Sequence, residues 1–179
     1  MIRIASFPRA WVPPPWVDQI VGIFRRHERR IDSGRIEALR SSREVLAILA
    51  GDLEGVGFHI EHLEHSSRRV PRQPLSAGAS AAQHCHVDVY HPQWHCCIAI
   101  EDGPTWTKDA MDGDGVEPLL VADADTLCLA VPAVVGGTGS LGSAQRASES
   151  EYDRALALAQ VVYTRSRTYL PHRLVLIGY

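Results

Sequence analysis

The chain has 179 residues, of which 45% are hydrophobic and 22% charged, and its formal net charge is −3. This length suits one domain with a core of its own, and the composition is that of a globular chain. No apolar run reaches the roughly 18 residues that a membrane span needs, and the first residues lack the apolar centre of a secretion signal. We therefore expect a cytoplasmic protein with no membrane partner.

The distribution of cysteines and charges refines this expectation. Cys85, Cys96, Cys97 and Cys128 do not have the spacing of a disulfide framework, so reduced thiols are expected. Residues 1–80 hold 12 Arg and 9 acids, a balance of +3, whereas residues 81–179 hold five Arg, one Lys and 12 acids, a balance of −6. The acids therefore gather in the second part of the chain, and the arginines gather ahead of them.

The first predicted elements are an irregular arm and a helix within residues 1–40. The arm ends at Pro13-Pro14-Pro15, and apolar residues recur on one helical face from Trp16 onward. The end of this helix carries four arginines: Arg25, Arg26, Arg29 and Arg30. They are either solvated residues that complement the helix dipole or a patch that faces phosphates.

Residues 41–132 are predicted to form the core of the domain. Ser41 and Glu44 have the spacing of a capping box, which predicts a helix from there to about Gly55. The later elements, in chain order, are a strand at 58–61, strands His86–Tyr90 and Cys96–Ile100 joined as a hairpin, a helix at 107–120, and an apolar strand Thr126–Val131.

The remaining residues are predicted to form a flexible loop, a helix and a strand. The loop covers 133–148, the helix Glu149–Arg167 and the strand Arg173–Tyr179. Since strands alternate with helices in the second half, the chain is predicted to be a single α/β domain, residues 1–179, with a mixed sheet and helices on its faces.

Two acids in the predicted hairpin are the first candidate site. Asp88 lies within one strand, and Glu101 ends the other, two residues after Ala99 and therefore on the same face as Ala99. Two such acids can converge on one divalent cation. The alternative is that both merely occupy exposed strand surfaces.

The order helix 41–55, strands 57–61, 86–90 and 96–101, helix 107–120 and strand 126–131 resembles the αβββαβ core of the PD-(D/E)xK restriction-endonuclease-like nucleases. A group of bacterial and phage proteins with that fold is similar in particular segments, which cover most of the chain from Ser41 to Tyr179. The segments are GDLEGVGFHIE, HVDVY, IAIEDG, LLVADADTLCLAVP and LPHRLVLIGY.

The resemblance implies roles for individual residues. Asp88 takes the place of the family's first acid, and Glu101 takes the third position of (D/E)xK, where the family also has Glu. Ala99 stands where the second acid should be, which removes one oxygen ligand from the site. Glu101 would then be the second metal ligand, and Lys108 would supply the positive charge of the family's strand lysine.

The activity implied is hydrolysis of DNA phosphodiesters with Mg²⁺ or Mn²⁺, with the four arginines as backbone contacts and with a homodimer as the expected assembly. Two other functions stay open. One is a degenerate member of the fold that binds nucleic acid or a protein. The other is a zinc-stabilised binding protein that uses the histidines and cysteines of the hairpin, although strand geometry disfavours it. Those residues are His84, Cys85, His86, His91, His95, Cys96 and Cys97.

Overall fold

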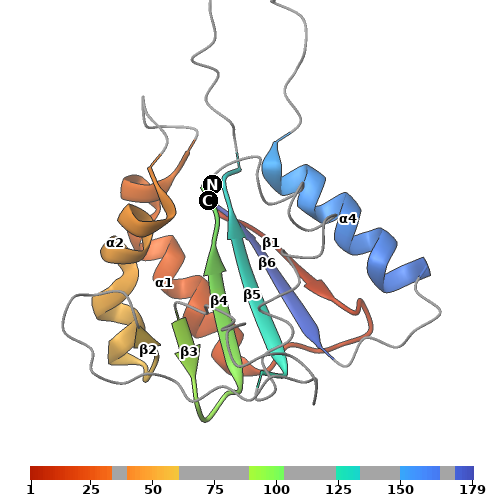
Figure 1. The fold of residues 1–179 in the computed structure, drawn as a ribbon, viewed down its shortest axis with the longest axis horizontal. Helices are drawn as coiled ribbons and strands as arrows, with labels where there is room; N and C mark the ends of the chain where they lie inside the picture. Colours follow the sequence, from red (N-terminus) through yellow and green to blue (C-terminus); the bar gives the residue numbers. More distant parts are fainter. Residues whose placement is uncertain (34–39, 61–88, 103–123, 134–149, 166–171) are drawn as a thin grey trace, which may run out of the picture.

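A computed structural model describes residues 1–33, 40–60, 89–102, 124–133, 150–165 and 172–179 (Figure 1). Its elements, in chain order, are β1 (Arg3–Phe7), α1 (Pro15–Ile31), α2 (Ser42–Gly55), β2 (His59–Ile60), β3 (Val89–His91), β4 (Cys96–Ile100), β5 (Thr126–Val131), α4 (Glu151–Arg165) and β6 (Arg173–Gly178). None of the helices within these ranges is both long and apolar enough to cross a membrane.

The strands form one six-stranded mixed sheet in the order β1-β6-β5-β4-β3-β2. The three central strands β4, β5 and β6 are parallel, while β1 pairs antiparallel with β6 and β3 pairs antiparallel with β4. β2 adds a short antiparallel edge next to β3. The predicted α/β class, with a mixed sheet, is therefore confirmed.

The helices cover both faces of this sheet (Figure 1). α1 and α2 pack on one face over Cys96, Ile98 and Cys128, all of which are fully buried. α4 packs on the opposite face, over Leu129 and Leu176 among others. Each parallel strand is thus apolar on both sides, as expected for strands that are covered by helices on both faces.

The second helix forms as its sequence predicts. The Ser41 hydroxyl accepts a hydrogen bond from the Glu44 amide, and the Glu44 carboxylate accepts one from the Ser41 amide at 2.8 Å, so the capping box is complete. The inner face of the helix carries buried apolar residues, namely Val45, Leu46, Leu49 and Leu53, with Ile48 partly buried beside them. The helix ends at Gly55, as predicted.

The prediction of an irregular N-terminal arm was wrong. Residues Arg3–Phe7 form β1, which pairs antiparallel with β6 from Arg3 opposite Gly178 to Phe7 opposite Leu174. The strand buries Ala5 and Phe7 against the cluster beneath α4, although Ile4 is 39% exposed on the other side. Because β1 depends on a partner at the far end of the chain, local patterning did not reveal it.

The other predicted elements agree with the structure where it describes them. β4 and β5 have the predicted bounds, and α4 and β6 lie within theirs. Of the predicted strand His86–Tyr90, Val89 and Tyr90 belong to β3, whereas residues 86–88 lie outside the described ranges. The predicted helix 107–120 and nearly all of the loop 133–148 also lie outside them.

Gly57 shapes the connection from α2 to β2. Its φ of +105° lies in the region that residues with a side chain rarely adopt. A Cβ atom at this position would stand 2.9 Å from Nε2 of His91. The backbone of the turn therefore approaches the His91 ring as closely as a glycine permits.

We expect Gly57→Ala to destabilise the protein by about 1–3 kcal/mol, because the positive φ and the proximity of His91 both disfavour a side chain. The control is Gly51→Ala in the middle of α2, where a Cβ atom meets nothing within 4 Å. That substitution should stabilise the helix by up to about 1 kcal/mol. Urea unfolding measures both changes, and equal midpoints for Gly57→Ala and wild type would contradict this interpretation.

Candidate functional site

The candidate site lies where the three parallel strands end. Glu101 and Asp102 follow β4, Pro132 and Ala133 follow β5, and Tyr179 follows β6; we call these five residues the carboxyl edge. In open sheets with helices on both faces, ligands bind outside the carboxyl ends of the parallel strands. The residues that gather there are therefore the ones to test for function.

Backbone hydrogen bonds fix the positions of the edge residues. The Glu101 amide donates to the Ala130 carbonyl at 2.9 Å, and the Tyr179 amide donates to the Val131 carbonyl at 3.0 Å. The Ala133 amide donates to the Tyr179 carbonyl at 2.6 Å. Parallel pairing thus continues beyond the strands themselves and fixes the backbone of the edge residues.

Glu101 occupies the place that the sequence predicts for it, at the end of β4, and its side chain is partly exposed. Its carbonyl accepts a hydrogen bond of 2.6 Å from the Tyr179 hydroxyl. Burial raises the pKa of Tyr179, and the negative charges of Asp102 and Glu101 raise it further. Tyr179 therefore remains a neutral donor at physiological pH, and both carboxylates lie near enough to influence it.

The other two predicted catalytic residues, Asp88 and Lys108, lie outside the described residues. Ala99, at the position of the missing second acid, is described and packs against the apolar cluster beneath α4. Among the residues that the structure describes, no three His, Cys, Asp or Glu side chains form a group that could hold a metal ion. A site built from described residues alone would thus have at most two such ligands.

Two helix ends meet the carboxyl edge. The Ser42 amide, in the first turn of α2, donates to the Asp102 carboxylate at 3.0 Å, and an anion is favoured at this end of a helix. The Ser33 hydroxyl, just beyond α1, donates to the Tyr179 carbonyl at 2.6 Å. The last turn of α1 and the first turn of α2 therefore both border the edge.

The four arginines of α1 have exposed side chains, as expected for either of their predicted roles. Arg29 and Arg30 lie in the last turn of α1, at the helix end that is followed by Ser33, the residue in contact with the carboxyl edge. Arg26 is engaged with Asp52 of α2, with Nε 3.1 Å from Oδ2. His27 contacts the same carboxylate and, together with Arg26, lowers the pKa of Asp52. The four side chains are thus not equivalent. Arg26 is paired with Asp52, whereas Arg29 and Arg30 belong to the end of α1 that leads to the carboxyl edge.

Glu151, in the first turn of α4, is a residue that the sequence did not single out. Its side chain is only 2% exposed, and one oxygen, Oε1, accepts from Arg154 at 2.9 Å. The other oxygen, Oε2, is buried and has no hydrogen-bond partner among the described residues. The Tyr152 amide donates to the Pro132 carbonyl at 3.3 Å, which places this turn beside the carboxyl edge.

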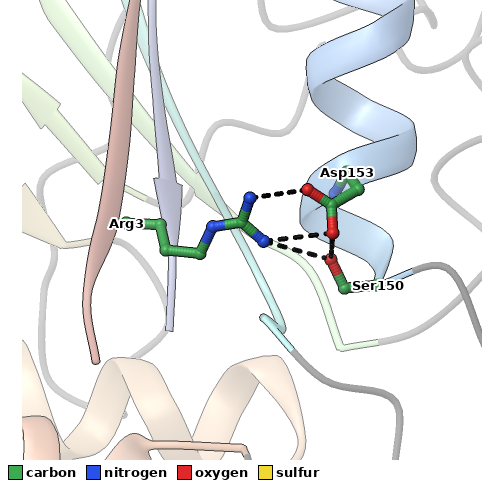
Figure 2. A network of polar contacts seen from close by, with 3 residues as sticks. All are labelled: Arg3, Ser150 and Asp153. Carbon is green, nitrogen blue, oxygen red and sulfur yellow. Dashed lines mark hydrogen bonds and ion pairs between the residues drawn. The ribbon is translucent and has the colours of Figure 1, made fainter.

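The first turn of α4 is held to β1 by a polar network (Figure 2). Two guanidinium nitrogens of Arg3 contact the two carboxylate oxygens of Asp153, at 2.6 and 3.1 Å. The Ser150 hydroxyl accepts from the Asp153 amide at 3.1 Å and caps the helix. Ser150 and Asp153 have capping-box spacing, so this helix start was predictable from the sequence, whereas the burial of Glu151 was not.

The described members of the His/Cys cluster do not converge on one point. Cys96 and Cys97 are both fully buried, the first beneath α1 and α2 and the second beneath α4, so they lie on opposite faces of the sheet. His95 is exposed in the turn, with a φ of +46°. His84, Cys85 and His86 lie outside the described residues.

His91 has a structural environment in which both ring nitrogens are bonded. Nε2 lies 2.9 Å from the Val56 carbonyl, and Nδ1 accepts from the Trp94 amide at 3.2 Å. The ring stacks on Trp94 at 3.8 Å between centroids. A carbonyl on one side and an amide on the other fit the neutral ring with its proton on Nε2. Burial, the largest influence, lowers the pKa of His91.

Comparisons with protein-family models, with curated proteins and with solved structures found no match to this chain. The functional interpretation therefore depends on the described residues and their contacts.

The environment of His91 predicts a specific pH dependence of stability. Because the pKa of His91 is lowered from 6.5 in the folded state, the unfolded chain binds more protons, and stability rises with pH. The contribution is present above pH 6.5 and is lost as the pH falls through the lowered pKa.

We therefore expect His91→Gln to flatten the loss of stability between about pH 7 and 5, because glutamine does not titrate. His95→Asn, in the same turn, is the control for removal of an exposed histidine, and asparagine tolerates the positive φ. Urea unfolding at several pH values measures the slopes. An unchanged slope in His91→Gln would show that other groups cause the acid sensitivity.

Proposed function

We propose that this protein hydrolyses DNA phosphodiester bonds with the help of Mg²⁺ or Mn²⁺. The observation that carries the proposal is the position of Glu101. It prolongs β4 at the carboxyl edge, beside the first turn of α2, and its side chain is partly exposed. A carboxylate at the end of a parallel strand is well placed to act on a ligand bound outside the sheet.

The order of the described elements supports the same proposal. α2 is followed by the antiparallel strands β2, β3 and β4, and the chain then returns to β5, which lies parallel to β4. This is the helix and the four strands of the αβββαβ order that the sequence resembles. The remaining helix of that order would fall within residues 103–123, outside the described ranges.

The proposed site combines two carboxylates, one lysine and two arginines. Glu101 and Asp88 offer carboxylate oxygens, the ligands that Mg²⁺ and Mn²⁺ prefer. A bound ion of this kind neutralises charge on the phosphate and lowers the pKa of an attacking water. Lys108 stabilises the additional charge of the transition state, and Arg29 and Arg30 contact the DNA backbone and set its position.

We expect Asp88→Ala and Glu101→Gln each to lower Mg²⁺-dependent nicking of supercoiled plasmid by at least about 100-fold, because each removes a charged ligand of the ion. The control is Asp125→Asn, an exposed acid at the opposite, amino end of β5, which should nick at the wild-type rate. Circular dichroism verifies that all variants fold. Wild-type nicking by both site variants would refute the proposed site.

A second function is favoured by the packing of Ala99. The side chain at the position of the expected second acid contributes to an apolar cluster rather than to a metal site. A protein that keeps the fold but binds DNA without cleaving it would have this property. The two functions share Arg29 and Arg30 as backbone contacts and differ in whether the DNA is cut.

The double variant Arg29→Gln, Arg30→Gln tests the shared arginines. We expect weaker DNA binding at all sequences and a salt dependence of log K that is shallower by about one for each phosphate that the variant no longer neutralises. Arg173→Gln, an exposed arginine at the amino end of β6, is the control. Fluorescence anisotropy at several salt concentrations measures the slope, and an unchanged slope would exclude these arginines as DNA contacts.

A further inference from the structure

We infer that Glu151 supplies a further carboxylate to the divalent-cation site of Asp88 and Glu101, in place of the acid that is missing at Ala99. This inference rests on the proposed function and adds a ligand from a different element of the fold. Four properties of Glu151 support it: its position, the face of the sheet on which it lies, its unpartnered oxygen and the rigidity of its helix turn.

The position of Glu151 brings it to the same end of β5 as Glu101. The Glu101 amide donates to Ala130, the second-to-last residue of β5, at 2.9 Å. The amide of Tyr152, the neighbour of Glu151, donates to the carbonyl of Pro132, directly after β5, at 3.3 Å. The two acids therefore border the end of one strand, although 50 residues separate them in the chain.

Both acids also belong to the α4 side of the sheet. Ala99 and Leu129 pack in the cluster beneath α4, and Glu101 follows Ala99 by two residues along the continued ladder. Side chains two apart on an extended strand share a face. Glu151 begins α4 itself. A carboxylate from α4 can thus occupy the side of the sheet on which the family's second acid is expected.

One oxygen of the Glu151 carboxylate is available to bind a ligand. Its side chain is 2% exposed, Arg154 binds Oε1, and Oε2 has no partner among the described residues. A buried carboxylate oxygen without a hydrogen bond is unfavourable, and such atoms in folded proteins usually contact a water or an ion. A divalent cation at Oε2 would satisfy this oxygen.

The turn that carries Glu151 is fixed before any ligand binds. Arg3 of β1 holds Asp153 through two contacts (Figure 2). Tyr152 is buried over Gly178, where a Cβ atom would stand 2.6 Å from its ring. Ligands carried by helices and strands are positioned more precisely than ligands on loops. Two carboxylates completed by waters are a common ligand set for Mg²⁺.

The test is Mn²⁺ binding by the full-length protein without DNA, measured by isothermal titration calorimetry on wild type, Glu101→Gln and Glu151→Gln. We expect each substitution to weaken Mn²⁺ binding at least about tenfold, because each removes a charged ligand of the ion. The control is Glu54→Gln on the exposed surface of α2, which should bind like wild type. If Glu151→Gln does not fold, Glu151→Asp replaces it in the test. This variant keeps the charge but has a shorter side chain, so it should also bind Mn²⁺ more weakly than wild type.

The outcomes separate this inference from the proposed function. If Glu101→Gln loses affinity for Mn²⁺ and the Glu151 variants keep it, Glu151 is structural and the proposed function survives. If wild type does not bind Mn²⁺, the ion site fails together with this inference. If substitutions of both acids weaken Mn²⁺ binding but the wild type does not nick plasmid, the shared cation site is supported and the proposed nuclease activity is refuted.

Discussion

The structure depends on β5, whose six residues are all buried. A strand in this position pairs on both sides, in parallel with β4 and with β6. It also needs an apolar cover on both faces, since every residue from Thr126 to Val131 is withdrawn from water. Parallel neighbours require long crossover connections, and here α4 is one of these connections and covers one face. The pairing of β5 thus determines the layers of the fold and brings three strand ends to one edge.

The carboxyl edge carries negative charge beside the ends of two helices. Glu101 and Asp102 follow β4, while the amide of Ser42 and the last turn of α1 approach from the helical layer. Backbone dipoles at the start of α2 offset part of the negative charge. The Asp102 carboxylate benefits because it accepts the hydrogen bond of the Ser42 amide. Glu101, one residue earlier, contributes its carbonyl to Tyr179 and leaves its carboxylate partly exposed. Two adjacent acids thus have different contacts, since the Asp102 carboxylate accepts from the Ser42 amide at the start of α2, whereas the Glu101 carbonyl accepts from the Tyr179 hydroxyl.

Much of the fold was predictable from local signals. The capping box of Ser41 and Glu44, the apolar run Thr126–Val131 and the stripe of α4 each indicate their structure within a few residues. β1 could not be predicted in this way, because five residues of mixed character become a strand only when β6 pairs with them. The same reason explains why Glu151 was missed: acids at a helix start are typical of a favourable charge near the dipole, and the burial of one of them arises from packing against distant elements.

The candidate site also combines features that the local sequence predicts with features that depend on distant packing. The sequence located Glu101 at the end of β4, but it could not tell that Cys96 and Cys97 are buried on opposite faces, nor that His91 has both nitrogens bonded. Those facts remove the described hairpin residues from a common zinc site, since ligands of one ion must converge.

The presence of alanine at position 99 also has a physical consequence. Ala99 lies opposite Leu129 in the parallel register and packs in the apolar cluster beneath α4. An acid there would place a charge against this cluster, which is unfavourable without a cation. A buried carboxylate lies instead near the end of β5, at Glu151, where Arg154 and the helix start already compensate for part of the charge. In the proposed enzyme, moving the acid from the strand to the helix would keep the ligand while leaving the centre of the sheet apolar.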